Sequence, residues 1–433
     1  MGFTPLRELP ATPGWKKGDV VVIFGELFSR GYVNGLVDEA QRQGLKVIFS
    51  TVGRREDNQT LRPLNQTELT EKDQPLINVP LEAGFDMQPS AKNVSPVMQL
   101  QGLKLSDWQT AQLDWPQVED SHHMGIADFE KRVSQYVKQL EAHIPIGANV
   151  LFVHTMAGGV PRAKIVMPAM NRVFKGHGDR YASSEEFWQT DMGKLCATNF
   201  MEVTAQTFHH FIEATTDLRQ KVEKNGGRSA YVAYGYHGTE VLIQGKYQWQ
   251  SYSPYLQGFA KIELENIATR AMKSGIRASV YNAPEILTNS SSIFLGVEVA
   301  LYPLLGALER EGKKSNEVKD IIQQCLKLIK PEHSLNSIME YTTQYFTSPV
   351  IREWSNFPAW PQHNGPAQMA AMRAASTDLI NMHMDTKNMM TSILSEVVFN
   401  ACGKLMLAQS WEPQQPVWWI GHDIVAKQTA QEN

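Results

Sequence analysis

Residues 20–24 (VVVIF) constrain the fold most. This run is entirely apolar and rich in β-branched side chains, as is typical of a strand buried on both faces of a parallel sheet. Gly25 ends it, apolar residues at helical spacing follow as far as Gly44, and a second apolar run covers residues 45–50. This order of strand, loop, helix and strand predicts the first unit of an α/β, Rossmann-type doubly wound parallel sheet.

Later segments continue the alternation of strands and helices. Further strands are predicted at residues 74–79, 148–155, 229–234 and 277–281, and helices at residues 200–212, 260–271 and 293–308. A polar break at residues 311–315 predicts the end of the core. We therefore expect a Rossmann-type dinucleotide-binding and catalytic domain at 1–312. A mostly helical C-terminal extension, packed on this core, is expected at 313–433.

Composition excludes several other classes of protein. The net charge of -4 argues against nucleic-acid binding, and the three cysteines are too few and too scattered for a disulfide framework or a metal site. Neither a signal peptide nor an apolar run near the roughly 18 residues needed for a membrane span is visible. We expect a cytoplasmic protein with no metal and no membrane span.

The loop after the first strand predicts a dinucleotide site. Glycines such as Gly25 and Gly31 let the backbone approach a pyrophosphate at the N-terminus of the following helix. Two arginines follow the second strand, where the adenosine ribose normally lies, and they suit the 2′-phosphate of NADPH without excluding NADH. The predicted cofactor-binding residues around this loop are Gly25, Ser29, Arg30, Gly31, Tyr32, Arg54, Arg55 and Asn78.

Tyr252 and Lys261 form a Y-x8-K pair in front of a helical pattern. A phenol can donate a hydrogen bond to a carbonyl oxygen that becomes an enolate oxygen. A lysine about two helical turns further on can hold the hydroxyls of the nicotinamide ribose. Together the two side chains suit hydride addition to an activated double bond.

The segment from 230 to 312 resembles the V-type (FabV-like) trans-2-enoyl-acyl carrier protein and trans-2-enoyl-CoA reductases of the short-chain dehydrogenase/reductase superfamily. The resemblance rests on residues 232–240, on the Y-x8-K pair with Gly258 and Ala260 before the lysine, and on residues 287–293. The strand 152–155 and the first glycine loop are closer to the smaller I-type enoyl reductases.

The resemblance implies reduction of a trans-2-enoyl thioester, carried by acyl carrier protein or coenzyme A, to the saturated acyl thioester in fatty-acid or related metabolism. It implies that Tyr252 donates to the thioester oxygen and that Lys261 binds the ribose. It also implies that Tyr236 faces the substrate, while Thr288 and Ser290 contact the nicotinamide carboxamide or the pyrophosphate.

Alternatives remain open. The segment 241–251 is longer than in the family pattern, so Tyr247 or Tyr255 could be the donor in place of Tyr252. A short-chain-type carbonyl reductase usually needs its lysine four residues after the tyrosine, where Leu256 stands here. A third possibility is a non-catalytic dinucleotide-binding scaffold.

Overall fold

The computed structural model describes residues 4–29, 31–72, 74–236, 238–250, 255–288, 291, 294–353 and 363–431. Its centre is a parallel β-sheet. Among the described residues, eight strands form this sheet, in the order β1-β12-β11-β8-β7-β2-β3-β6. Along the sheet their bounds are β1 Pro5–Leu6, β12 Val417–Ile420, β11 Ala278–Asn282, β8 Ser229–Gly235, β7 Val150–His154, β2 Val20–Glu26, β3 Lys46–Thr51 and β6 Leu76–Pro80.

The sheet is parallel at every pairing of these strands. Strand β2 lies between β3 and β7, with Val20 opposite both Lys46 and Val150. Its side chains alternate between the two faces: Val20, Val22 and Phe24 join one hydrophobic cluster, while Val21 and Ile23 join another. Each face must therefore be covered by helices, which confirms the doubly wound fold predicted from the sequence.

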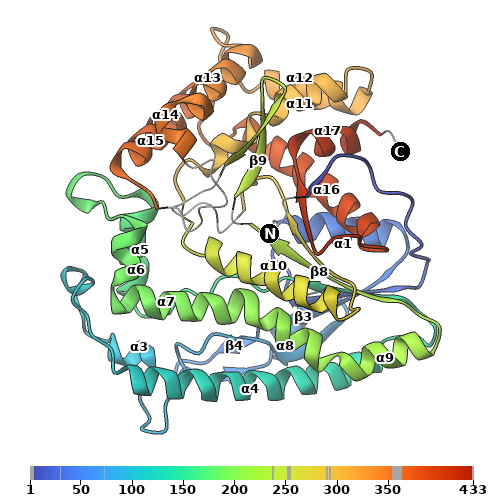
Figure 1. The fold of residues 1–433 in the computed structure, drawn as a ribbon, viewed down its shortest axis with the longest axis vertical. Coiled ribbons are helices and arrows are strands. Elements are labelled where there is room, and N and C mark those ends of the chain that lie inside the picture. Colours follow the sequence, from blue (N-terminus) through green and yellow to red (C-terminus); the bar gives the residue numbers. More distant parts are fainter. Residues whose placement is uncertain are drawn as a thin grey trace.

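Two groups of helices cover the faces (Figure 1). The cluster that contains Phe24 is completed by α4 Trp115–Glu141, α8 Thr207–Ala214, α9 Thr216–Lys224 and α10 Gly258–Lys273, with α7 Asp191–Met201 and the π-helix η3 Glu202–Gln206 between them. The opposite cluster is completed by α1 Tyr32–Arg42, α11 Leu304–Glu311, α12 Asn316–Leu326, α16 Met390–Gln409 and α17 His422–Ala430.

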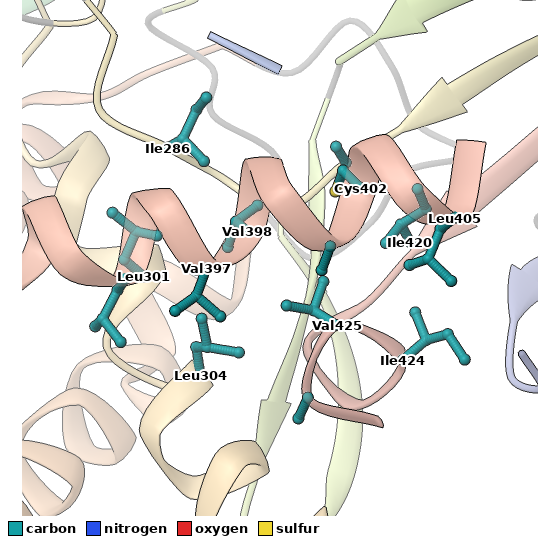
Figure 2. Close-up of a cluster of buried hydrophobic side chains, with 14 of the residues drawn as sticks. Ile286, Leu301, Leu304, Val397, Val398, Cys402, Leu405, Ile420, Ile424 and Val425 are labelled. Atoms are coloured by element: carbon teal, nitrogen blue, oxygen red, sulfur yellow. The ribbon is translucent and has the colours of Figure 1, made fainter. Parts of the chain in front are cut away.

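Helix α16 is a core element of the second face. Figure 2 shows Val397, Val398 and Cys402 of this helix among side chains from residues 286–304 and from β12 and α17. By length and composition α16 is the one helix in the described residues that could cross a membrane, which corrects the expectation that no segment is long enough. Because 67% of its apolar window is buried inside the protein, we interpret it as a core helix.

The main sheet includes a strand from beyond residue 312, where the core domain was expected to end. Strand β12, deep in the part expected to be a helical extension, pairs with β11 through Val280 and Val417. Trp418 and Trp419 thus belong to a strand of the main sheet. The division into domains at 1–312 and 313–433 stays a prediction.

Smaller elements surround this core. They are β4 Arg54–Arg55, β5 Leu61–Arg62, β9 Thr239–Ile243, β10 Lys246–Gln250, α2 Gln66–Thr70, α3 Pro96–Gln99, α5 Val166–Lys175, α6 Ser184–Gln189, α13 Leu335–Thr347, α14 Pro349–Arg352, α15 Pro366–Asn381, and the 3-10 turns η1 Leu105–Asp107, η2 Gly178–Arg180 and η5 Val297–Leu301. Ser183 and Glu186 form a capping box at the start of α6.

Candidate active site

The sheet has a switch point between β2 and β7. From β2 the chain continues through α1 to β3, on one side, whereas from β7 it continues to β8, on the other. Ligands of doubly wound sheets bind at such a point, outside the carboxyl ends of the strands. Helix α1 begins there, and no side chain of the described residues caps its first turn. Its backbone N–H groups therefore suit the pyrophosphate of a dinucleotide.

Gly25 makes the turn at the end of β2 possible. Its φ of 123° lies in the range that favours glycine, and a Cβ atom would stand 2.3 Å from Oγ1 of Thr155. Ser50 fixes the turn, because its hydroxyl accepts the N–H of Gly25 at 3.0 Å and donates to the carbonyl of Ile23 at 2.6 Å. The close approach of β2, β3 and β7 leaves room for a backbone but not for a side chain at this position.

Glu26 follows at the very end of β2 and is buried. Its carboxylate accepts hydrogen bonds from both terminal nitrogens of Arg54 at 2.9 Å, from Lys72 Nζ at 2.8 Å and from Thr51 Oγ1 at 2.9 Å. Burial raises the pKa of this carboxyl, but the hydrogen bonds outweigh burial and lower the pKa to about 2. The group is an anion at every physiological pH.

A cavity of about 270 Å³ opens beside this carboxylate. It is lined by residues from the loop after β2, from β3 and from the segment before β6, among them Glu26, Phe28, Asn34 and Lys72. The side chain of Phe28 is 64% exposed, although a large apolar ring is normally covered. The position of the cavity, beyond β2 and β3, is where the adenosine half of a dinucleotide lies in this fold.

Two predicted cofactor residues are already engaged by the protein. Arg55 Nε donates to Glu82 at 2.7 Å, so that neither of the arginines expected to bind a 2′-phosphate is free of a carboxylate partner. The amide of Asn78 accepts the N–H of Leu64 and donates to its carbonyl, both at 2.8 Å. Asn78 therefore ties the preceding loop to β6. Arg30 lies outside the described residues.

Lys261 lies on the first turns of α10 and points at the end of β8. Its Nζ donates to the carbonyl of Tyr234 at 2.8 Å, and the side chain is buried. Burial lowers the pKa of this ammonium to about 8. Buried His154, at the end of β7, lies close enough for Lys261 to lower its pKa further, and its Nε2 is 2.8 Å from Thr207 Oγ1.

Aromatic side chains gather beside this lysine. Tyr32 stacks on Tyr234 with ring centroids 5.9 Å apart and donates a hydrogen bond to the carbonyl of Pro284. Tyr236 meets Tyr255 edge to face at 5.5 Å. The structure thus brings together the predicted residues Tyr32, Tyr236 and Lys261 from three separate segments. The predicted donor Tyr252 lies outside the described residues.

The long segment before Tyr252 is a β-hairpin. Strands β9 and β10 pair antiparallel, and Gln250 stands opposite Thr239, so the chain returns to the level where it left β8. Both terminal nitrogens of Arg7 donate to Glu240 at 2.6 Å, and the hydroxyl of Tyr247 donates to Asp423. The hydroxyl of Tyr247 is therefore already bound to a residue of α17, which argues against this alternative donor.

The last predicted cofactor segment contains Thr288 and Ser290. Thr288 is described, and its N–H donates to Ser291 Oγ at 2.7 Å while its own hydroxyl accepts the N–H of Ser291 at 3.0 Å. This reciprocal pair fixes the backbone between Thr288 and Ser291. Ser290 lies outside the described residues.

Sequence reasoning missed two buried carboxyls at strand ends, Glu26 and Glu285. A glutamate two residues after a run as apolar as residues 20–24 was a usable signal, since a charge at that place needs partners. Glu285 was harder to identify as a buried carboxyl, because it follows Pro284 in a segment whose spatial neighbours come from distant parts of the chain.

A parallel sheet of this order with a glycine turn at its switch point defines a Rossmann-type fold suited to binding a dinucleotide, and a buried lysine lies beside the next strand end. Comparison with known protein families identifies the family of the chain. The family of enoyl-acyl carrier protein reductase FabMG matches residues 2–429, and the chain belongs to this family. The protein is thus an enoyl-acyl carrier protein reductase, as predicted, while the V type expected from the sequence is not the type that matches.

Two solved structures support the assignment over the whole chain. An apo structure of FabMG, described as a novel type of enoyl-acyl carrier protein reductase, is 43% identical, with a TM-score of 0.95, and the match covers 99% of this chain and 98% of that one. An NADH-bound structure of FabMG is 38% identical, with a TM-score of 0.79 and the same coverage. A comparison with curated proteins found no match.

Proposed function

We propose that this enzyme uses NADH to reduce trans-2-enoyl thioesters of acyl carrier protein to the saturated thioesters, in the cytoplasm. The observation that carries the proposal is the family match over nearly the whole chain, together with a relative that binds NADH. When bound, the nicotinamide supplies the hydride that adds to the β-carbon of the substrate.

The charges near the adenosine cavity favour NADH over NADPH. The carboxylate of Glu26 faces this cavity, and Arg54 and Lys72 are both bound to it. A 2′-phosphate would bring about two further negative charges toward an anion whose cations are already engaged. A ribose 2′-hydroxyl carries no charge and meets no such repulsion. We therefore interpret the basic residues that suggested NADPH as members of an ion-pair network that stabilises the fold.

Lys261 and Tyr252 act on the reacting end of the site. The buried ammonium of Lys261, with its Nζ at the end of β8, holds the nicotinamide ribose hydroxyls and adds positive charge where the enolate develops. Tyr252 donates to the thioester oxygen. The β9–β10 hairpin returns Gln250 to the level of Thr239, so the extra residues 241–249 form a loop out from β8 and back.

Tyr236 faces the substrate from the end of β8 and delivers a proton to the α-carbon. Its ring lies against Tyr255, which in turn contacts Phe294 at 5.4 Å, so that apolar edges border the reacting carbons. An apolar surround strengthens each hydrogen bond made to the developing charge. Thr288 and Ser290 remain proposed contacts of the cofactor.

The direct test is the loss of reduced-nicotinamide absorbance with trans-2-butenoyl-acyl carrier protein, run with NADH and NADPH in parallel and repeated with the coenzyme A thioester. We expect oxidation that needs the enoyl thioester, is faster with NADH and prefers the carrier protein. Binding of NADH without oxidation would favour the scaffold alternative instead. Oxidation by a ketone or aldehyde alone would favour the carbonyl-reductase alternative.

A further inference from the structure

Glu285 is a buried carboxyl that the proposed mechanism does not yet use. It lies just after β11, follows Pro284 and is only 7% exposed. Its Oε1 accepts the N–H of Ile286 at 3.3 Å. Among the described residues, its Oε2 has no hydrogen-bond partner. A carboxyl so deeply buried with one oxygen unpaired is costly for stability, which suggests that it has a function.

The groups around Glu285 favour its neutral form. Burial is the largest effect and raises its pKa to about 8, although the hydroxyl of Tyr236, which hydrogen-bonds to it, lowers the pKa. Glu298, which faces it from η5 and accepts a hydrogen bond from Ser376, raises the pKa further. Glu285 in turn raises the pKa of two phenols that face it, those of Tyr32 and Tyr255.

A small cavity connects this carboxyl with Tyr236. Its volume is about 20 Å³, and Glu285, Tyr236 and Thr239 all line it. That volume suffices for one water molecule. In the described residues the hydroxyl of Thr239 is a second buried polar atom here without a partner. The cavity is therefore polar enough to pass a proton between Glu285 and the tyrosine.

We propose that Glu285 is the proton reservoir of the reduction and acts through Tyr236. This inference rests on the proposed function, in which hydride addition to the β-carbon leaves an enolate that must gain a proton at the α-carbon. The O–H bond of Tyr236 breaks as its proton forms the new C–H bond. The phenolate oxygen takes the proton of the Glu285 carboxylic acid, and the carboxylate left behind regains a proton from water before the next turnover.

Geometry assigns Glu285 to this task rather than the other carboxyls. The Glu26 carboxylate is bound by Arg54 and Lys72 and is always ionised, so it holds no proton to give. Glu298 is buried too, but its carboxyl is bonded to Ser376 on α15. In the described residues, Glu285 combines burial, an unpaired oxygen and contact with a tyrosine at the site.

The test compares Glu285→Gln with a control variant, Glu298→Gln. Glutamine keeps the shape and a hydrogen bond but cannot exchange a proton. We expect Glu285→Gln to reduce turnover at saturating NADH by about 10²-fold, the lower range for a lost general acid. Affinity for NADH, measured by fluorescence, should change less than about twofold. The loss of turnover above pH about 8 should become smaller in Glu285→Gln, where only the contribution of Lys261 is left, and should keep its full size in Glu298→Gln.

Infrared difference spectra provide a readout that needs no turnover. In the wild type, a protonated carboxyl band should vanish as the pH rises through about 8, and Glu285→Gln should lack this band. Tyr236→Phe serves as a second variant if Glu285→Gln does not fold. It should lose turnover similarly and move the midpoint of the band to higher pH, because the hydrogen bond that favours the carboxylate is gone.

The inference fails if the folded Glu285→Gln variant turns over at the wild-type rate, if Tyr236→Phe does so, or if no carboxyl band titrates near pH 8. Failure of the proposed function looks different, because the wild type itself would then not oxidise NADH with the enoyl thioester. The two kinds of failure can be told apart, because the turnover of every variant is compared with that of the wild type.

Discussion

Both terminal nitrogens of Arg54 donate hydrogen bonds to the carboxylate of Glu26, each at 2.9 Å. The arginine that looked free for a phosphate in the sequence therefore neutralises an anion at the end of the neighbouring strand. Lys72 binds the same carboxylate at 2.8 Å. Removing the carboxylate would release two cations beside the adenosine cavity.

Glu26→Gln is therefore expected to shift cofactor preference toward NADPH. We predict that the ratio of the NADPH to the NADH dissociation constant falls at least tenfold, or by about 1.4 kcal/mol, as measured by fluorescence titration. Glu39→Gln is the matched control, because Glu39 pairs with Arg42 on α1. An unchanged ratio in Glu26→Gln would show that this network does not discriminate between the cofactors.

Tyr252→Phe is expected to lower turnover about 10²- to 10³-fold, the typical effect of removing one donor to a developing oxyanion. Affinity for NADH should stay nearly the same, because the proposed hydroxyl contact is with the substrate. Tyr247→Phe is the control, since Tyr247 bonds to Asp423 on the far side of the hairpin. Full turnover in Tyr252→Phe together with loss in Tyr255→Phe would move the donor role to Tyr255.

NADH binding is expected to weaken as the pH rises above about 8, because burial lowers the pKa of Lys261 to that value and its ammonium is then lost. The groups near Lys261 are the carbonyl of Tyr234 and the buried ring of His154. The pKa in the folded protein lies below the ordinary lysine value of 10.5, so burying the ammonium costs stability below pH 8 and this cost disappears between pH 8 and 10.5.

Lys261→Met separates this effect from that of Glu285. Its NADH dissociation constant should be raised at neutral pH and should no longer depend on pH around 8. The NADH dissociation constants of Lys261→Met and Glu285→Gln should be measured by titration from pH 6 to 10 under the same conditions. An alkaline weakening that persists in Lys261→Met would assign it to another group.

Gly403→Ala is expected to destabilise the fold by about 1–3 kcal/mol in urea unfolding. Helices α1 and α16 touch through their backbones here, and a Cβ on Gly403 would stand 2.1 Å from the carbonyl carbon of Gly35. Gly306→Ala in α11 is the control, because its Cβ would meet only Met339 Sδ at 3.4 Å. Equal stability of the two variants would mean that α1 and α16 can separate without cost.

Much of the fold could be predicted because parallel strands buried on both faces appear in a sequence as continuous apolar runs. The runs at β2, β3, β7, β8 and β11 were found in this way. Strand β12 was missed, since Val417–Ile420 is short, rich in tryptophan and pairs with a strand far away in the sequence. The polar stretch after β3 holds α2 and the small β4–β5 pair, whose periodicity is too short to detect.

Local spacing pointed to Lys261, and the structure places its Nζ at the end of β8, while its role at the site stays a prediction. The cofactor role of Arg54 stays a prediction too. Its partner in the structure, Glu26, could not be found from the sequence, because Glu26 lies on another strand and only the pairing of β2 with β3 brings the two together. Tyr252 stays a prediction.

The central claim is hydride transfer to the β-carbon with protonation of the α-carbon by a residue that exchanges with water. Mass spectrometry of the acyl product tests it most directly. With NADH deuterated at the transferred position, in ordinary water, we predict one deuterium at the β-carbon; with ordinary NADH in heavy water, we predict one at the α-carbon. A saturated product that takes up no deuterium from NADH, or no saturated product at all, would contradict the account.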